Sequence, residues 1–162
     1  MDITKIANFI LYMIDNKVSH INDKKLSILL FLIDYKSLQT YDTKIFGEEY
    51  IKTPRNPEPK VLSELFDIIA NEEDLEEDDE RLYLIQELLD FVDIEIVKKS
   101  NFIELQFVKF EEEFDKSIFT RKELKLIDEI LEKYKNATPR NIANACFNIE
   151  KVRETAKGEI II

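Results

Sequence analysis

Residues 23–42 read DKKLSILLFLIDYKSLQTYD, and the six consecutive apolar residues at 28–33 decide how the chain folds. This run is too short to cross a bilayer, which needs about 20 apolar residues. A buried strand is the second possibility, but good helix formers continue on both sides, and no glycine or proline interrupts residues 24–39. Asn22 is a suitable N-cap, and Asp23 adds a negative charge to the first turn. The stretch therefore predicts a helix.

The apolar side chains of this predicted helix cover nearly its whole circumference. Four recur at helical spacing and three more extend the apolar surface to the other sides: Leu26, Leu29, Leu30 and Ile33, then Ile28, Phe31 and Leu32. A helix that is apolar nearly all round packs against several neighbours, so we expect a central core helix over 23–39. Asp34 is the polar exception. We favour a structural role for it, accepting hydrogen bonds from a neighbouring loop or pairing with a buried cation, over catalysis.

Hydrophobic spacing predicts the other helices. The signals include a capping box at Thr120–Glu123 and an N-cap followed by proline at Thr138-Pro139. We expect helices at 3–14, 61–69, 82–92, 120–134 and 138–147.

The pattern changes to strict alternation at 92–96 and again at 103–107, which predicts an antiparallel hairpin within 92–110. We expect short strands at 45–51 and 159–162 to extend that sheet. The proline-rich residues 53–60 predict a rigid extended loop, and the acidic residues 71–80 predict a solvated loop or a frayed helix end. The predicted fold class is α+β, mainly α, in a single domain over residues 1–162.

The charge balance restricts the partners. The chain has 162 residues, with 23 Lys and Arg against 34 Asp and Glu, which gives a net charge of −11. Such a field repels phosphates and argues against nucleic acid, whereas it favours solubility or a basic partner. The single cysteine excludes an internal disulfide and fits a reducing compartment. The stretch MDITKIANFI does not resemble a signal peptide, so we expect a cytoplasmic protein with no membrane segment.

The residues needed for the common catalytic and cofactor sites are too few. With two glycines, one histidine and one cysteine, the chain has no glycine-rich phosphate loop and no usual zinc cluster, so we expect neither metal nor cofactor. His20 and Cys146 are the one possible nucleophile–base pair, and we interpret them as a loop histidine and an inert core cysteine. We therefore assign no catalytic residue and expect no enzyme. An enzyme with an unrecognised carboxylate site remains an alternative.

Two separated blocks resemble one known family. The pattern K-L-x-x-L-L-x-x-x-D-x-x-x-L-x-x-Y occurs from Lys25 to Tyr41, and F-T-x-x-E-L-x-x-I-D-x-I-L-x-x-Y occurs from Phe119 to Tyr134. Both are similar to the Panacea domain of SocA-like antitoxins. The chain departs from the family where Asn56-Pro57-Glu58 replaces a Gly-Pro-Val step, where Asp42 replaces a glycine, and where Cys146-Phe147 and Val152 replace a Ser-His and a tryptophan.

The resemblance implies an antitoxin-like protein that binds and neutralises a cognate toxin of a bacterial or phage toxin–antitoxin system. One member type delivers its toxin to a protease, so a proteolytic adaptor is a second possibility. Family members serve many different toxins, so the fold names no target.

We predict the partner surface from stiffness and charge. The proline loop offers Arg55 on a rigid segment with Pro57, and Tyr41 and Tyr50 are candidate aromatic anchors. The acidic stretch would steer a basic partner through Glu76, Glu77, Asp78 and Asp79. The simpler alternative is that the proline loop only turns the chain between a strand and a helix.

Overall fold

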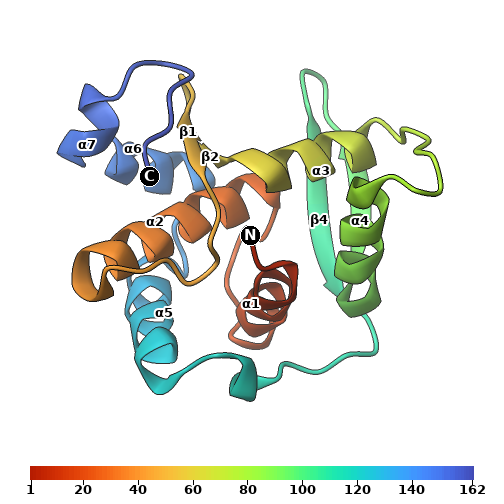
Figure 1. Ribbon diagram of the computed structural model, residues 1–162, viewed down its shortest axis with the longest axis horizontal. Coiled ribbons are helices and arrows are strands. Elements are labelled where there is room, and N and C mark those ends of the chain that lie inside the picture. Colours follow the sequence, from red (N-terminus) through yellow and green to blue (C-terminus); the bar gives the residue numbers. More distant parts are fainter.

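The computed structural model describes residues 1–162 and is 52% helical, with seven helices and two small antiparallel sheets (Figure 1). The fold class is therefore α+β and mainly α, which confirms the prediction. The helices are α1 (Ile3–Asp15), α2 (Asp23–Tyr41), α3 (Lys60–Ala70), α4 (Glu80–Phe91), α5 (Arg121–Tyr134), α6 (Pro139–Cys146) and α7 (Glu150–Glu154). The strands are β1 (Tyr50–Lys52), β2 (Pro57–Pro59), β3 (Val92–Lys98) and β4 (Ile103–Lys109).

Helix α2 is the central element, as the sequence predicts. The Asn22 side chain accepts a hydrogen bond from the Lys25 N–H at its start, and Asp42 ends it in the left-handed region at a φ of 58°. All six residues of the 28–33 run are buried, because α2 contacts α5 and α6 as well as β2 and β4. Tertiary packing on several sides, rather than one apolar stripe, therefore stabilises this helix.

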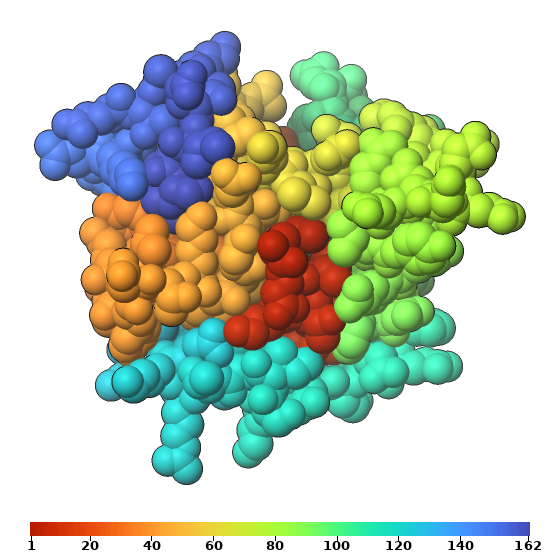
Figure 2. All heavy atoms as spheres, viewed as in Figure 1, coloured from red at the N-terminus to blue at the C-terminus, as the bar shows by residue number.

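Helix α1 and the β3–β4 hairpin form the other half of the core. The hairpin is confirmed, with Ile94 opposite Phe107 and Ile96 opposite Leu105. Helix α1 packs on α4 and on both strands, and β4 also contacts α2 and α3. Figure 2 shows the start of the chain, in red, surrounded on this face by α4 in green, residues near 40–60 in orange and yellow, and the α5 region in cyan.

The second sheet differs from the prediction. Strand β1 pairs with β2 and not with the hairpin, and the chain end at 158–162 lies along the other side of β1. The Tyr50 N–H donates to the Ile162 carbonyl at 3.0 Å, and the Ile161 N–H donates to the Tyr50 carbonyl at 2.7 Å. The expectation that segments 45–51 and 159–162 extend the hairpin sheet was wrong, because each finds its hydrogen-bond partner in the other.

Two prolines lie inside β2, in a segment predicted to be an extended loop. Tyr50 and Lys52 direct their backbone groups to the chain end, so Ile51 is the β1 residue that faces β2, opposite Glu58. Hydrogen bonding alternates along an antiparallel pair, so the backbone nitrogens of Pro57 and Pro59 point away from β1. Their missing N–H groups therefore cost no hydrogen bond between the strands.

The acidic stretch connects α3 to α4. Residues 71–78 are exposed except for the half-buried Leu75, which confirms the prediction of a solvated loop. The capping box at Thr120 and the Thr138 N-cap with its following proline are also present. The short helix α7 was not predicted. No helix combines the length and apolar character that a membrane span requires.

Candidate partner-binding site

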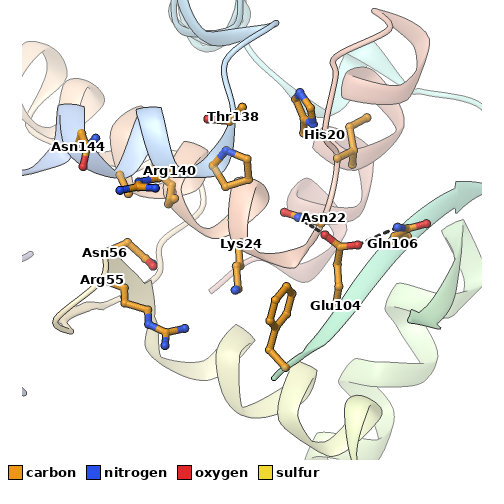
Figure 3. Close-up of a pocket in the computed structure, with 15 residues that line it drawn as sticks. His20, Asn22, Lys24, Arg55, Asn56, Glu104, Gln106, Thr138, Arg140 and Asn144 are labelled. Atoms are coloured by element: carbon orange, nitrogen blue, oxygen red, sulfur yellow. Dashed lines mark hydrogen bonds between the residues drawn. The ribbon is translucent and has the colours of Figure 1, made fainter. Parts of the chain in front are cut away.

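A cavity of about 920 Å³ opens where five segments meet (Figure 3). These are the connection between α1 and α2, the start of α2, the turn between β1 and β2, the beginning of β4, and the first turns of α6. Most of the lining residues are polar, and they include amide side chains from four of these segments. Large cavities with a few convergent polar groups are the usual sites of recognition.

One wall is a hydrogen-bonded junction between β4 and the start of α2. The two carboxylate oxygens of Glu104 accept hydrogen bonds from Asn22 Nδ2 at 2.7 Å and from Gln106 Nε2 at 2.8 Å (Figure 3). Beside it, the Asp23 carboxylate accepts a hydrogen bond from the Leu105 N–H at 3.1 Å. The hydrogen bond from Gln106 is the main reason that the pKa of Glu104 lies below its usual value. Glu104 is therefore ionised, and both of its oxygens are engaged.

Three cations from separate elements line the same cavity. Lys24 comes from α2, Arg55 from the β1–β2 turn and Arg140 from α6, and Figure 3 shows Lys24 between the two arginines and the Glu104 wall. None of the three has a carboxylate oxygen within 4.0 Å. The Lys24 ammonium lies 4.1 Å from the ring centre of Phe102, whose side chain is 43% exposed.

The guanidinium groups of the two arginines are also free of hydrogen bonds within the protein. The guanidinium of Arg81 binds Asp79 and Glu64, and that of Arg153 binds backbone carbonyls. The guanidinium groups of Arg55 and Arg140 have no such partner. Arginine presents five donors in a planar fork that matches a carboxylate or a phosphate, so these two groups are available to an anionic ligand.

Two further carboxyl groups lie in electrostatic range of the cavity cations. Burial raises the pKa of Glu58, and the nearby Arg55 and Lys24 partly oppose that shift. Burial also raises the pKa of Asp23, again opposed by Lys24. The cations therefore reduce the free-energy cost of burying these two charged carboxylates, although they form no contact ion pairs with them.

Lys25 links two segments of the cavity rim through hydrogen bonds of its ammonium group. Its side chain is fully buried, and its ammonium donates to the carbonyls of Ser19 at 2.7 Å, Lys135 at 3.0 Å and Ala137 at 2.7 Å. Burial lowers the pKa of this amine to about 8. These bonds fasten the segment that carries His20 to the segment that leads into Thr138, so two edges of the cavity share one anchor.

Asp34 lies in the core and has the predicted structural role. One carboxylate oxygen accepts hydrogen bonds from the N–H groups of Ile45 at 2.7 Å and Phe46 at 2.9 Å, and the other accepts one from the Tyr50 hydroxyl at 2.8 Å. Burial raises the pKa of Asp34, and burial together with the Asp34 charge raises the pKa of Tyr50. The carboxylate thus ties the loop after α2 to the helix core.

The predicted partner residues are separated by the structure. Arg55 lines the cavity and Tyr41 is 39% exposed at the end of α2, with the Lys122 ammonium 5.6 Å from its ring centre. Tyr50 and Pro57 are buried. The expectation that Tyr50 offers an exposed anchor was therefore wrong, because Asp34 binds its hydroxyl within the core.

The acidic residues lie away from the proline turn. Glu76, Glu77 and Asp78 are exposed, whereas Asp79 caps α4 and forms a 2.8 Å ion pair with Arg81. Helix α3 separates this stretch from the Arg55 turn, and its 11 residues span about 16 Å at the 1.5 Å rise of an α-helix. The two parts of the predicted surface are not one continuous patch.

The possible nucleophile–base pair has no support in the geometry. Cys146 is fully buried, and burial raises the pKa of its thiol to about 12. His20 is exposed at the edge of the cavity, with a φ of 57°. A buried thiol with a raised pKa is not a reactive nucleophile.

Sequence reasoning missed most of the cavity. Lys24, Phe102 and Arg140 line it, and no periodic pattern distinguished them from other surface residues. A local signal existed only for Arg140, which directly follows the Thr138-Pro139 helix start. The role of Lys25 was also missed, because its three acceptors are backbone carbonyls that no side-chain motif marks.

The comparisons with known proteins give one family. The model of the family described as antitoxin SocA-like, Panacea domain, matches residues 26–150. That range holds helices α3 to α6, both sheets and nearly all of α2. No curated protein and no solved structure matches the chain.

Proposed function

The chain belongs to the family of SocA-like antitoxins with a Panacea domain, and from this premise we propose that it binds a cognate toxin protein and neutralises it. The family match over residues 26–150 carries the proposal, since it covers the β1–β2 turn, the hairpin and α6, which form most of the cavity. The family suggests a role that is not enzymatic. The partner is accordingly a protein of a bacterial or phage toxin–antitoxin system, and both proteins act in the cytoplasm of the bacterial cell.

We place the contact surface at the cavity and the exposed end of α2. Arg55 is the charged contact, and Pro57 and Tyr50 act indirectly, because they are buried and hold the turn that presents Arg55. Tyr41 is an accessible aromatic contact outside the cavity. Glu76, Glu77 and Asp78 would act at longer range by steering a basic partner, with an effect on association rate more than on final affinity.

Co-expression with the genes adjacent to this one tests the proposal. We expect one small neighbouring product to stop growth when it is expressed alone, to be harmless when this chain is present, and to co-purify with it. A chain carrying Leu30→Asp, which places a charge in the core, controls for expression without a folded antitoxin.

Two outcomes would contradict neutralisation by binding alone. Rescue that requires a cellular protease and lowers the amount of toxin would indicate a proteolytic adaptor. Turnover of nucleotides or nucleic acid by the purified chain alone would indicate an enzyme. If no neighbouring product is toxic and none co-purifies, the antitoxin proposal itself fails.

A further inference from the structure

We propose that the cavity receives an acidic segment of the toxin, whose carboxylates pair with Lys24, Arg55 and Arg140. This inference rests on the proposed function, and it names the chemistry of the partner segment. The cations come from three elements that are distant in sequence, so only the folded chain creates the site.

Charge complementarity is the first argument. The chain has a net charge of −11, yet the cavity lining holds three cations against one carboxylate, that of Glu104. Glu104 is already occupied by Asn22 and Gln106, so it does not neutralise the three cations by direct contact. The nearby Glu58 and Asp23 also form no ion pair with these cations within 4.0 Å. A carboxylate of the bound segment supplies that contact.

The remaining lining suits a peptide. The exposed side-chain amide of Asn144 provides a donor and an acceptor of the kind that match a polypeptide backbone, and the amide oxygen of Gln106 is a further acceptor. The exposed ring of Phe102 offers apolar contact for an adjacent side chain. One face of that ring is covered by the Lys24 ammonium at 4.1 Å, which favours a carboxylate partner over a stacked nucleotide base.

The walls are fixed before a ligand arrives. Lys25 ties two rim segments together, and the β1–β2 turn is closed by a bond from the Thr53 hydroxyl to the Asn56 carbonyl at 2.7 Å. The Asn56 amide donates to the Pro57 carbonyl at 2.8 Å. Binding therefore orders mainly the long side chains of the cations and little backbone, which lowers its entropic cost.

A synthetic peptide tests the chemistry without the toxin. The probe is a fluorescein-labelled hexapeptide that alternates Glu and Asp, and the controls are a Lys hexapeptide, inorganic phosphate and AMP. We expect the acidic peptide to bind and to shift the backbone amide signals of Lys24, Arg55, Phe102 and Arg140 in two-dimensional NMR. The triple variant Lys24→Glu, Arg55→Glu, Arg140→Glu should bind it at least about tenfold more weakly.

A second triple variant controls for net charge. Lys36, Lys125 and Lys151 are exposed cations outside the cavity, and changing all three to Glu alters the charge by the same amount. This control should bind the acidic peptide with less than a threefold change. Melting curves of both variants report whether the fold is kept. Three results would each overturn the proposal. They are an equal loss of peptide affinity in both variants, NMR shifts outside the cavity, and stronger binding of phosphate or AMP at the same residues.

Growth rescue separates the two proposals. If the wild-type chain neutralises a toxin and the cavity variant neutralises it equally well, the acidic-segment proposal is wrong while the antitoxin function stands. If no toxin is found, the antitoxin function fails, and the peptide titration still decides whether the cavity selects carboxylates. A loss of rescue in the cavity variant that is restored by Asp→Lys or Glu→Lys changes in the toxin would support both.

Discussion

Asp34 is the residue whose surroundings explain most about the loop that follows α2. Its carboxylate accepts three hydrogen bonds, from two backbone N–H groups and from the Tyr50 hydroxyl, in a fully buried position. A buried carboxylate is costly unless such donors compensate it, and buried donors without an acceptor are costly as well. The carboxylate and the loop therefore depend on each other.

Removing that carboxylate should be more destabilising than removing one of its donors. Asp34→Ala leaves three buried donors unpaired, at about 1–3 kcal/mol each, whereas Tyr50→Phe removes one donor and keeps the ring. Urea unfolding of both variants measures the difference, and the double variant reports the coupling between the two side chains. Equal losses of unfolding free energy would show that the backbone contacts of Asp34 contribute little.

Lys25 predicts a distinctive pH dependence. Burial lowers the pKa of its amine from the ordinary 10.5 to about 8, so between these values the unfolded chain holds a proton that the folded chain has released. Stability linked to this group therefore rises as the pH increases from about 8 toward 10.5. Lys25→Met lowers stability at every pH because the carbonyls of Ser19 and Ala137 lose this donor, while that of Lys135 keeps only its bonds from Ser19. The deficit should widen across that window. A constant deficit between pH 7 and pH 10 in urea unfolding would contradict the assignment.

At the scale of elements, α2 is the central helix, against which α5, α6, β2 and β4 pack. Leu30 is fully buried in the middle of the helix, so Leu30→Ala should lower the free energy of unfolding by about 2–5 kcal/mol. Gln39 lies on the exposed last turn, and Gln39→Ala serves as the control with a change below about 0.5 kcal/mol. Thermal and urea unfolding give both values. A small effect at Leu30 would mean that α2 is not the centre of the core.

The strand-like chain end offers a matched pair of residues. Ile161 is 2% exposed and its N–H binds Tyr50, whereas its neighbour Ile160 is 48% exposed. Ile161→Ala should cost about 2–5 kcal/mol, and Ile160→Ala distinctly less, because only the first opens space in the core. Similar effects in unfolding experiments would indicate that the chain end adds no packing to β1.

At the scale of the whole molecule, the acidic surface predicts a kinetic effect. Replacing Glu76 and Glu77 with Gln and Asp78 with Asn should slow association with a basic toxin, most strongly at low salt, and leave dissociation nearly unchanged. Asp79 is kept because it caps α4 and pairs with Arg81. Stopped-flow association at two salt concentrations measures the effect. A slower rate at high salt as well would point to lost contacts in place of lost steering.

Prediction succeeded where local chemistry decides the outcome. The Asn22 cap and the Thr120–Glu123 box determine where α2 and α5 begin, and the alternating residues of 92–110 form the hairpin. The predicted structural role of Asp34 is also confirmed, because a carboxylate inside an apolar run requires donors from the packed chain. Prediction failed for Tyr50, since an aromatic residue in a strand is equally compatible with the core and the surface.

The sequence by itself determined that this protein is mainly helical, that α2 is its buried centre and that it resembles SocA-like antitoxins, because periodicity, capping and family motifs are properties of neighbouring residues. Only the tertiary structure decided which strands pair, since the chain end and β1 are separated by about a hundred residues and compete with the hairpin for the same kind of backbone bond. It also decided the candidate site. Lys24, Arg55 and Arg140 acquire a shared role only because α2, the β1–β2 turn and α6 converge on one cavity, and no local pattern encodes that convergence.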